Sequence, residues 1–377
     1  MPNWFFLLVP VAVLLGALGF LTHRLIHAPR WRSRRARLAA LVGMVVLTGL
    51  SFLQFGAGPT FLSPAQARPL VWIGATWLAT ALYLLLGALV MAVLSLLLGW
   101  GNRERKTRVN RIGAALVVVA ALATTAYGVV KAADPTVTPM TFRSPALPAA
   151  FDGTKVALIT DIHAGAVRSA ATVQRIVDRT NAAEPDLVLI AGDLIDGPVD
   201  RYAAELTPLR GLRASLGVYA VTGNHEMYSG TISGWEDDWK TLGIQVVSNA
   251  VTTVTSGGDS MAIGGVHDWS GTGEFAPDYD AAVEGVAAST FQIVLAHQPR
   301  AASRLAGRGV DLQVSGHTHG GQLWPFRALV LLQQPMVDGQ AVIDGVPVIT
   351  SRGAGAWGPS VRVGADPEIP VLTMTRG

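Results

Sequence analysis

The segment VALITDIH, residues 156–163, decides the fold, because a short apolar run ends there in a carboxylate and an imidazole. Its apolar, partly branched residues are typical of a buried strand, and α/β sheets bind ligands just beyond the carboxyl ends of their strands. Four later runs have the same form, so we expect five strand ends to converge at one edge. They are LVLIA before Gly192-Asp193, VYAVT before Gly223-Asn224-His225-Glu226, FQIVLA before His297, and DLQVS before Gly316-His317-Thr318-His319.

Helical patterns lie between several of these runs. Residues 169–183 have an amphipathic spacing with Ser169 as a candidate N-cap, and residues 201–212 separate the second and third runs. This alternation predicts an α/β domain with a layered sheet. We place the domain at residues 151–377, which is long enough for a sizeable core. Residues 131–150 contain four prolines and no long apolar period, which predicts a linker.

The polar residues at the strand ends suit a pair of divalent cations. Asp161 and His163 lie two apart on an extended segment, so their side chains point to the same side and can bind one ion. His317 and His319 have the same spacing and can face one ion each. A carboxylate can bridge two ions, and Asp193 is best placed to do so. Oxygen and nitrogen ligands without a thiolate favour Mn, Fe, Zn or similar ions over Ca or Mg.

A structural role is the alternative for each of these residues taken alone, because a single His at a strand end is more often a satisfied core or surface residue. Five of the six histidines in the predicted domain nevertheless lie at or just past the ends of apolar runs. That pattern is hard to attribute to chance. The sixth, His267, lacks a partner of that kind, and we expect it to have a structural role.

Composition divides the chain into two unlike parts. The sequence has 377 residues, half apolar and only 15% charged, whereas a soluble domain usually has about a quarter of its residues charged. Through Asp134 the chain has 13 Lys+Arg and 2 Asp+Glu, a net charge of +11; the remainder has 16 and 24, a net charge of −8. The absence of Cys excludes disulfides, thiolate nucleophiles, zinc fingers and Fe–S clusters.

Four runs without a charged residue predict an all-α transmembrane region over residues 1–130. They are residues 4–21, 38–55, 70–100 and 112–130. About 20 helical residues cross the hydrocarbon core of a bilayer, and the longest run must tilt, kink or extend beyond it. Buried helices of a soluble protein are a weaker alternative, since four such runs exceed what a core needs. A cleaved signal peptide is another, but residues 1–3 carry no side-chain charge and the arginines follow the apolar run.

The basic residues predict the orientation of these spans. The loops at residues 22–37 and 101–111 are rich in arginine, whereas the loop between them, residues 56–69, has one basic residue, Arg68. The positive-inside rule places the first and third loops in the cytoplasm. We therefore expect a multi-pass cell-membrane protein with four spans, the lipid bilayer as a partner, and the C-terminal domain on the extracytoplasmic side.

Taken in order, the motifs Asp-x-His, Gly-Asp-x-x-Asp, Gly-Asn-His-Glu, a later His and Gly-His-Thr-His-Gly-Gly resemble those of the calcineurin-like metallophosphoesterases. The resemblance covers about residues 155–377 and looks closest to a membrane-associated bacterial branch. It implies a layered β-sandwich with flanking helices. It also implies one ion on Asp161, His163 and His319, a second on Asn224, His297 and His317, and Asp193 as the bridge. His225 would be the catalytic histidine, next to Asn224, and Glu226 stands where many members have Asp.

The expected activity is metal-dependent hydrolysis of a phosphodiester, a pyrophosphate or a phosphomonoester. A hydroxide that bridges the two ions would attack phosphorus, and His225 would donate a proton or stabilise charge. A non-catalytic metal-binding scaffold or receptor domain on a membrane anchor is the alternative, against which the complete ligand set argues. A transporter is disfavoured because the spans lack charged residues. Nucleic acid is not expected as a partner, because the acidic domain has no evident basic track.

The expected location favours a lipid-linked or envelope phosphate as substrate. Residues 323–326, Leu-Trp-Pro-Phe, and the run at 328–332 follow directly after the Gly-Gly turn. We hypothesise that they form an apolar lip that admits an acyl or prenyl chain. A core strand with a buried Trp is the alternative, and the sequence is at least as consistent with it.

Overall fold

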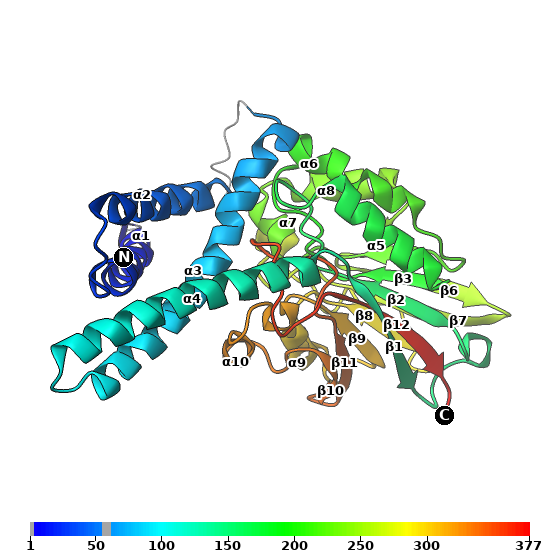
Figure 1. Ribbon diagram of the computed structural model, residues 1–377. Helices are drawn as coiled ribbons and strands as arrows, with labels where there is room; N and C mark the ends of the chain where they lie inside the picture. The colour runs from blue at the N-terminus through cyan, green and yellow to red at the C-terminus, as the bar shows by residue number, and fades with distance from the viewer. Residues whose placement is uncertain (1–3, 55–61) are drawn as a thin grey trace. The chain divides into compact units, whose positions relative to one another are not determined.

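The computed structural model describes residues 4–54 and 62–377 and divides into two compact units, Met1–Gly128 and Val129–Gly377 (Figure 1). Residues 1–3 and 55–61 lie outside the described ranges, and the latter include the first six residues of the loop predicted at 56–69. The observed boundary lies close to the predicted end of the transmembrane region at residue 130.

The N-terminal unit is built from helices. They are α1 (Trp4–Leu21), continued by a π-helical segment (Thr22–His27), α2 (Arg34–Ser51), α3 (Pro64–Leu98) and α4 (Arg103–Ala132), whose last turn belongs to the second unit. The sequence encodes the helix starts locally. The hydroxyl of Ser33 accepts a hydrogen bond from the backbone N–H of Ala36, and Ser63 forms a reciprocal capping box with Gln66 at the start of α3.

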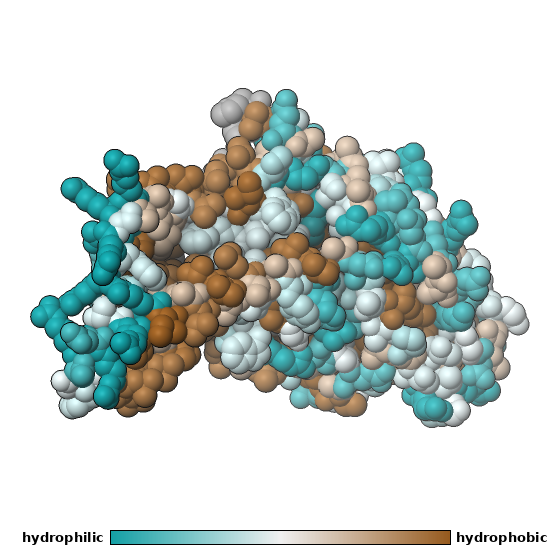
Figure 2. Space-filling view, in the orientation of Figure 1, coloured by the Kyte–Doolittle hydropathy of each residue, from teal (hydrophilic) through white to brown (hydrophobic). Residues whose placement is uncertain are grey.

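Two of these helices, α3 and α4, are long and apolar enough to cross a membrane. A helix is present in each of the four predicted apolar runs, but α2 starts at Arg34 and includes Arg35 and Arg37 in its 18 residues. Length and composition thus support two spans among the described residues, where the sequence predicts four. In Figure 2 the apolar surface of this unit borders a group of hydrophilic side chains near the turn between α3 and α4.

The C-terminal unit contains two six-stranded mixed sheets. The order of the first is β1-β12-β2-β3-β4-β5 and that of the second is β10-β11-β9-β8-β7-β6. In the first, β2 to β5 are parallel and β12 is antiparallel to β2; in the second, β11, β9, β8 and β7 are parallel. The strands are β1 (Thr136–Arg143), β2 (Lys155–Ile159), β3 (Leu187–Ile190), β4 (Val218–Ala220), β5 (Gln245–Val246), β6 (Ala250–Ser256), β7 (Asp259–Gly265), β8 (Gln292–Leu295), β9 (Leu312–Ser315), β10 (Gly339–Ile343), β11 (Val346–Thr350) and β12 (Glu368–Thr375).

The alternation of side chains along the strands explains the layers. Val156 and Leu158 of β2 face the second sheet, where they pack in one buried cluster with Ile293 of β8 and Val314 of β9. The intervening residues of β2 face the opposite way, toward α5 (Ala170–Ala182), α6 (Val199–Leu206) and α8 (Ile232–Thr241). The helix α9 (Ala302–Leu305) packs on the outer face of the second sheet. The expected layered β-sandwich with flanking helices is therefore the observed arrangement of this unit (Figure 1).

The segment at residues 131–150 differs from the predicted linker. It contains β1, which pairs in parallel with β12 over its whole length, from Thr136 opposite Glu368 to Arg143 opposite Thr375. Pro139 lies within β1. A proline is tolerated there because β1 is at the edge of the sheet, where half of the backbone N–H groups have no neighbouring strand. The prolines that indicated a linker in the sequence are thus compatible with an edge strand.

Candidate metal centre

The five predicted strand ends meet in the structure. β2, β3 and β4 of the first sheet and β8 and β9 of the second each lead into a loop that carries predicted residues. The backbone N–H of Asp161 donates to the carbonyl of Gly192, and that of His163 donates to the carbonyl of Asp193, both at 3.0 Å. The backbone N–H of His317 donates to the Asp161 carboxylate at 3.0 Å, which joins the two sheets. Because the motif strands belong to two sheets, the site lies between sheet edges.

The backbone at these loops adopts a conformation that side chains rarely accept. Five of the predicted ligands have a positive φ: Asp161 (56°), His163 (53°), Asp193 (54°), His317 (70°) and His319 (51°). Each such residue costs on the order of 1–3 kcal/mol, and such residues concentrate at binding and catalytic sites. At two glycines of the motifs, a larger residue is excluded because its Cβ would clash with a predicted ligand. A Cβ at Gly316 would lie 2.2 Å from the Asp161 carboxylate, and one at Gly223 would lie 2.2 Å from the Asp193 carboxylate.

Asp161, His163 and His319 form the first group of side chains that could hold an ion. The Nε2 atoms of His163 and His319 are 3.0 Å apart. The carboxylate of Asp161 is 3.2 Å from Nε2 of His319 and 3.8 Å from Nε2 of His163. All three residues are buried, so their donor atoms face one another in a small volume.

Asp193, His297 and His317 form a second such group, and His163, Asp193 and His225 form a third that overlaps both. The Asp193 carboxylate lies 3.2 Å from Nε2 of His297, and the side-chain oxygen of Asn224 lies 2.8 Å from Nδ1 of His317. The same Asp193 carboxylate is 3.6 Å from Nε2 of His163 in the first group. Asp193 therefore stands between the two groups, at the position that the sequence predicts for a bridging ligand.

The residues present fit metal ions. Nε2 of His297 is buried and makes no well-aligned hydrogen bond with the described residues, although the Asp193 carboxylate lies 3.2 Å from it, while its Nδ1 lies 2.7 Å from the Ala191 carbonyl oxygen. A buried nitrogen without a partner is costly, and a metal ion would satisfy it. The donor atoms within each group lie within 4.8 Å of one another, so they could reach one ion. Imidazole and carboxylate donors suit first-row transition ions.

Negative charge controls ionisation in this cluster. Burial acts to lower the pKa of His163, but the carboxylates of Asp196, Asp161 and Asp193 together raise it to about 9. Burial also acts to lower the pKa of His297, and Asp193 raises it well above its ordinary value. The carboxylates thus attract positive charge to the positions that bound cations would take. The pKa of His319 is well below its ordinary value, chiefly through burial, so its ring is neutral, the form that binds metals.

His225, the predicted catalytic residue, lies beside the two groups. Its Nδ1 is 2.8 Å from the Asp196 carboxylate, and its ring centroid is 4.4 Å from that of His163. The same Asp196 oxygen lies 2.7 Å from Nδ1 of His163, and its second oxygen accepts a hydrogen bond from Nη2 of Arg168 at 2.7 Å. The His225 side chain is 18% exposed, so it is held in place while still open to solvent.

Sequence reasoning missed several residues that hold this site together. Asp196 is the last residue of the Gly-Asp-x-x-Asp motif, and its place in that motif is the signal that could have found it. Glu226, fully buried, accepts hydrogen bonds from the backbone N–H groups of Gly223, Asp193 and Leu194. Arg362, also fully buried, donates to the carbonyl oxygen of His319 at 2.6 Å. It lies more than 40 residues from any motif, and no local pattern indicates it.

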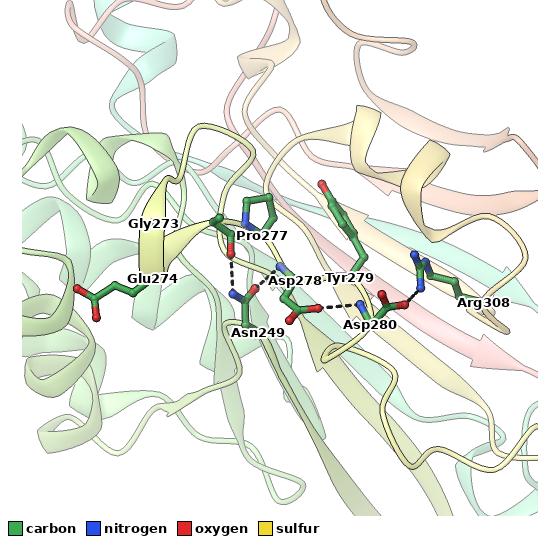
Figure 3. A pocket seen from close by; sticks show the side chains of 9 residues that line it. Asn249, Gly273, Glu274, Pro277, Asp278, Tyr279, Asp280 and Arg308 are labelled. Carbon is green, nitrogen blue, oxygen red and sulfur yellow. Dashed lines mark hydrogen bonds and ion pairs between the residues drawn. The ribbon is translucent and has the colours of Figure 1, made fainter.

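A separate pocket of about 400 Å³ lies beyond β6 and β7, on the loop at residues 273–280 (Figure 3). Its lining includes Glu274, Asp278 and Asp280, with Arg308 paired to Asp280. None of the predicted metal or catalytic residues lines it. In Figure 3 Asn249 lies at the centre of the pocket's hydrogen bonds, and it donates to the Ala276 carbonyl at 2.7 Å. The residues that line the pocket therefore hold the loop at residues 273–280 in place.

The two-sheet fold, with histidines and carboxylates gathered at the strand ends, defines the class as an α/β domain with candidate metal ligands at the ends of its strands. The family model of the calcineurin-like phosphoesterases matches residues 154–321. The domain belongs to this family, whose members depend on metal ions.

Curated relatives include proteins from animals and bacteria. A transmembrane protein with a metallophosphoesterase domain from Danio rerio is 32% identical over 69% of this chain and 62% of its own length. An uncharacterized metallophosphoesterase from Helicobacter pylori is 38% identical over 58% of this chain and 59% of its own. A further one from Bacillus subtilis is 29% identical over 62% of this chain and 83% of its own. The chain thus matches about three fifths of the length of the first two relatives.

Proposed function

We propose that this chain is a membrane-anchored, metal-dependent phosphoesterase. The position of Asp193 carries the proposal, because its carboxylate lies within 3.6 Å of an imidazole nitrogen from each of the two ligand groups. One carboxylate between two such groups is the arrangement that a pair of divalent ions requires. Membership of the phosphoesterase family supports the same activity.

Seven residues would hold the ions. Asp161, His163 and His319 would bind one, Asn224, His297 and His317 the other, and Asp193 both. Bound divalent ions polarise phosphoryl oxygens and lower the pKa of a coordinated water. His225 is outside this set, and its ring, 18% exposed, can donate a proton to the leaving oxygen or stabilise charge on the phosphoryl group. Asp196 orients His225 through its contact with Nδ1.

The test is hydrolysis of bis(p-nitrophenyl) phosphate and p-nitrophenyl phosphate by the full chain in detergent, with Mn²⁺ added or chelated. We expect activity that depends on the metal. His225→Ala should lower kcat about 10²–10⁴-fold and keep most of the metal. Asp193→Ala should empty or halve the metal content, whereas Asp237→Ala, an exposed aspartate on α8, should change neither quantity. Two ions retained by Asp193→Ala, or hydrolysis unaffected by chelation, would refute the assignment.

We also propose four spans with the phosphoesterase domain on the extracytoplasmic side. Contacts between the two basic loops support this topology. Nε of Arg111 donates to the Pro29 carbonyl at 2.8 Å, and Nη2 of Arg24 donates to the side chain of Asn110 at 3.3 Å. Loops that contact each other lie on one side of a membrane, and their arginines favour the cytoplasmic side.

A lipid-linked or envelope phosphate is the substrate class that we propose. The segment after the last metal motif is exposed rather than a core strand: Trp324 is 63%, Leu331 57% and Leu332 80% exposed. Its last part forms the short helix α10 (Arg327–Val330). Several large apolar residues that are exposed close together along the chain indicate a surface that binds lipid or another protein. Their position directly after His319 favours contact with the apolar part of a substrate.

Varying the length of the substrate's acyl chain tests whether the exposed apolar segment contacts that chain. We expect kcat/KM for a long-chain acyl phosphodiester to exceed that for its short-chain analogue, and the difference to shrink in Leu331→Ser/Leu332→Ser. Tyr127→Ser, an exposed aromatic on α4, is the matched control. Equal kcat/KM for the two esters in the unmodified protein would remove the lip from the proposal.

A further inference from the structure

A second polar cluster borders the metal centre but contains none of its ligands. The loop after β7 contributes Asp268 and Trp269, and the segment after β8 contributes Gln298, Arg300 and Arg304. Gln298 directly follows the predicted ligand His297. The two segments come from neighbouring parallel strands, which brings their ends to the same edge of the second sheet.

Buried polar side chains fix the position of Arg300. Its Nε donates to Oε1 of Gln298 at 2.7 Å, and that oxygen also accepts a hydrogen bond from Gln334 at 3.0 Å. The amide nitrogen of Gln298 donates to the Asp268 carboxylate at 2.9 Å. Gln298, Gln334 and Asp268 are each 3% exposed or less. A chain of buried hydrogen bonds therefore orients a guanidinium group that is itself only half-buried.

Both arginines of this cluster lie against one aromatic ring. The guanidinium carbon of Arg300 is 4.8 Å from the centroid of the Trp269 ring, and that of Arg304 is 5.6 Å from it. Trp269 is 37% exposed. Within residues 62–377, neither arginine has a carboxylate within ion-pair distance, although acidic residues outnumber basic ones in this domain. A pair of guanidinium groups without carboxylate partners is a ready site for an anion.

Tyr228 relates this cluster to the metal centre. Tyr228, 70% exposed, has its ring 5.7 Å from that of His225. Burial raises the pKa of Tyr228, the charges of Asp268 and Asp193 raise it further, and the charge of Arg300 opposes them. Charges of the metal centre (Asp193) and of this cluster (Asp268 and Arg300) thus both act on Tyr228.

We propose that Arg300 and Arg304, held against Trp269, form a second anion-binding subsite beside the metal centre. The preferred substrate then carries a phosphate group in addition to the one that is hydrolysed. This inference rests on the proposed phosphoesterase function and narrows its substrate class. The pocket of Figure 3 does not suit such a group, because three carboxylates line it and its arginine is paired.

A comparison of two esters that have the same reacting bond, only one of which carries a second phosphate, measures the contribution of the subsite to kcat/KM. Thymidine 3′-(p-nitrophenyl phosphate) and its 5′-phosphorylated form release the same p-nitrophenolate and differ by one phosphate. We expect the full chain with Mn²⁺ to have at least about a tenfold higher kcat/KM for the phosphorylated ester, since charge-assisted hydrogen bonds are the stronger kind. Arg300→Gln/Arg304→Gln should bring the ratio of the two values close to one, and high salt should reduce it.

Arg308→Gln is the matched control, because Arg308 is paired with Asp280 outside the cluster. Its ratio should equal that of the unmodified protein. Arg304→Gln alone covers the possibility that replacing the half-buried Arg300 disturbs folding, because Arg304 is exposed, and it should lower the ratio severalfold. A ratio near one in the unmodified protein, or an unchanged ratio in the double variant, would overturn the subsite.

Failure of the reaction itself is distinguishable from failure of the subsite. If neither ester is hydrolysed, the proposed phosphoesterase function fails, and calorimetric titration with thymidine 3′,5′-bisphosphate then decides the subsite without any turnover. Binding about tenfold weaker in the double variant than in Arg308→Gln supports it. Equal affinity in the two variants overturns it.

Discussion

Glu226 shows how one side chain can hold the loops of a metal centre in register. Its carboxylate accepts three backbone hydrogen bonds, from Gly223 after β4 and from Asp193 and Leu194 after β3. A carboxylate only accepts hydrogen bonds, so it matches three converging N–H donors. In the sequence Glu226 is an unremarkable neighbour of His225, and the only local signal is its spacing of three from Gly223, which resembles a capping box.

Replacing this carboxylate by an amide should destabilise the domain. In Glu226→Gln the amide NH₂ would face a backbone N–H and leave a buried donor unsatisfied, at a cost of about 1–3 kcal/mol. We expect the midpoint of thermal unfolding of the full chain in detergent to fall by several degrees. Glu284→Gln, at an exposed position, is the control. A midpoint equal to that of the control would show that the three hydrogen bonds contribute little.

His267, for which the sequence favours a structural role, is in none of the candidate metal groups. It is 6% exposed, its Nδ1 lies 2.9 Å from the hydroxyl of Thr222, and the nearest carboxylate, that of Glu236 on α8, is 3.9 Å away. Burial lowers its pKa to about 4. An unfolded His titrates near 6.5, so between about pH 6.5 and pH 4 the unfolded chain binds more protons at this residue than the folded chain does.

The stability contributed by neutral His267 is therefore present above pH 6.5 and lost as the pH falls toward 4. We expect the free energy of unfolding to drop less between pH 7 and pH 4.5 in His267→Gln than in the unmodified protein. Urea unfolding with a chelator present, which removes the effect of metal ligands, measures this difference. Parallel losses in the two proteins would mean that His267 does not titrate in this range on unfolding.

The predicted metal residues could be found from the sequence because they follow strands that are themselves local apolar runs. Asp161, Asp193 and His297 each lie one to three residues after a run that needs no distant information to recognise. Arg168 and Arg362 could not be found in this way, because an isolated arginine in a loop has no pattern. Their roles depend on backbone carbonyls and on Asp196, which only the folded chain brings to them.

At the scale of elements, α8 anchors the loop that follows β3. Trp235 and Trp239 of α8 are fully buried, and the indole N–H of Trp235 donates to the carbonyl of Gly197 at 3.0 Å. Gly197 directly follows Asp196. The packing of one helix therefore fixes the loop that carries Asp193 and the partner of His225.

Trp235→Ala should lower the free energy of unfolding by about 3–5 kcal/mol, because it leaves a large cavity. Trp235→Phe keeps most of the volume and removes the hydrogen bond, so its loss should be smaller. Denaturant unfolding of both variants gives the comparison. Similar losses in the two would assign the effect to the hydrogen bond with Gly197 rather than to packing.

The elements that the sequence could not predict are those that depend on distant pairing. The helix predicted at 169–183 appears as α5, and the runs at 156–160, 187–191 and 311–315 appear as β2, β3 and β9. β5 has only two residues, too few for any periodicity. β1 exists because β12 lies beside it, and its own proline-containing sequence favours a linker.

For the whole molecule, the division of charge and hydropathy along the sequence anticipated the division into two units. The change from a basic, apolar part to an acidic one lies near residue 134, and the structural boundary lies between Gly128 and Val129. Composition predicts such a boundary because a membrane-spanning region and a water-exposed domain face different solvents.

The chain contains no cysteine, so single introduced cysteines can test the topology cleanly. With the C-terminal unit outside, Ser303→Cys should react with a membrane-impermeant maleimide in intact cells. Glu104→Cys, in the basic first turn of α4, should react only after permeabilisation. Both positions are exposed. The opposite pattern would invert the proposed orientation, and labelling of both in intact cells would change the number of spans.

The pairing of β1 with β12 constrains when the C-terminal unit can mature. Thr138 and Glu368, 230 residues apart, are joined by a hydrogen bond across these two strands. During synthesis β1 emerges from the ribosome long before its neighbour exists, and contacts between such distant segments form slowly. Synthesis of this unit must therefore be nearly finished before its sheet closes, and until then the incomplete β-sandwich has one edge open to other chains.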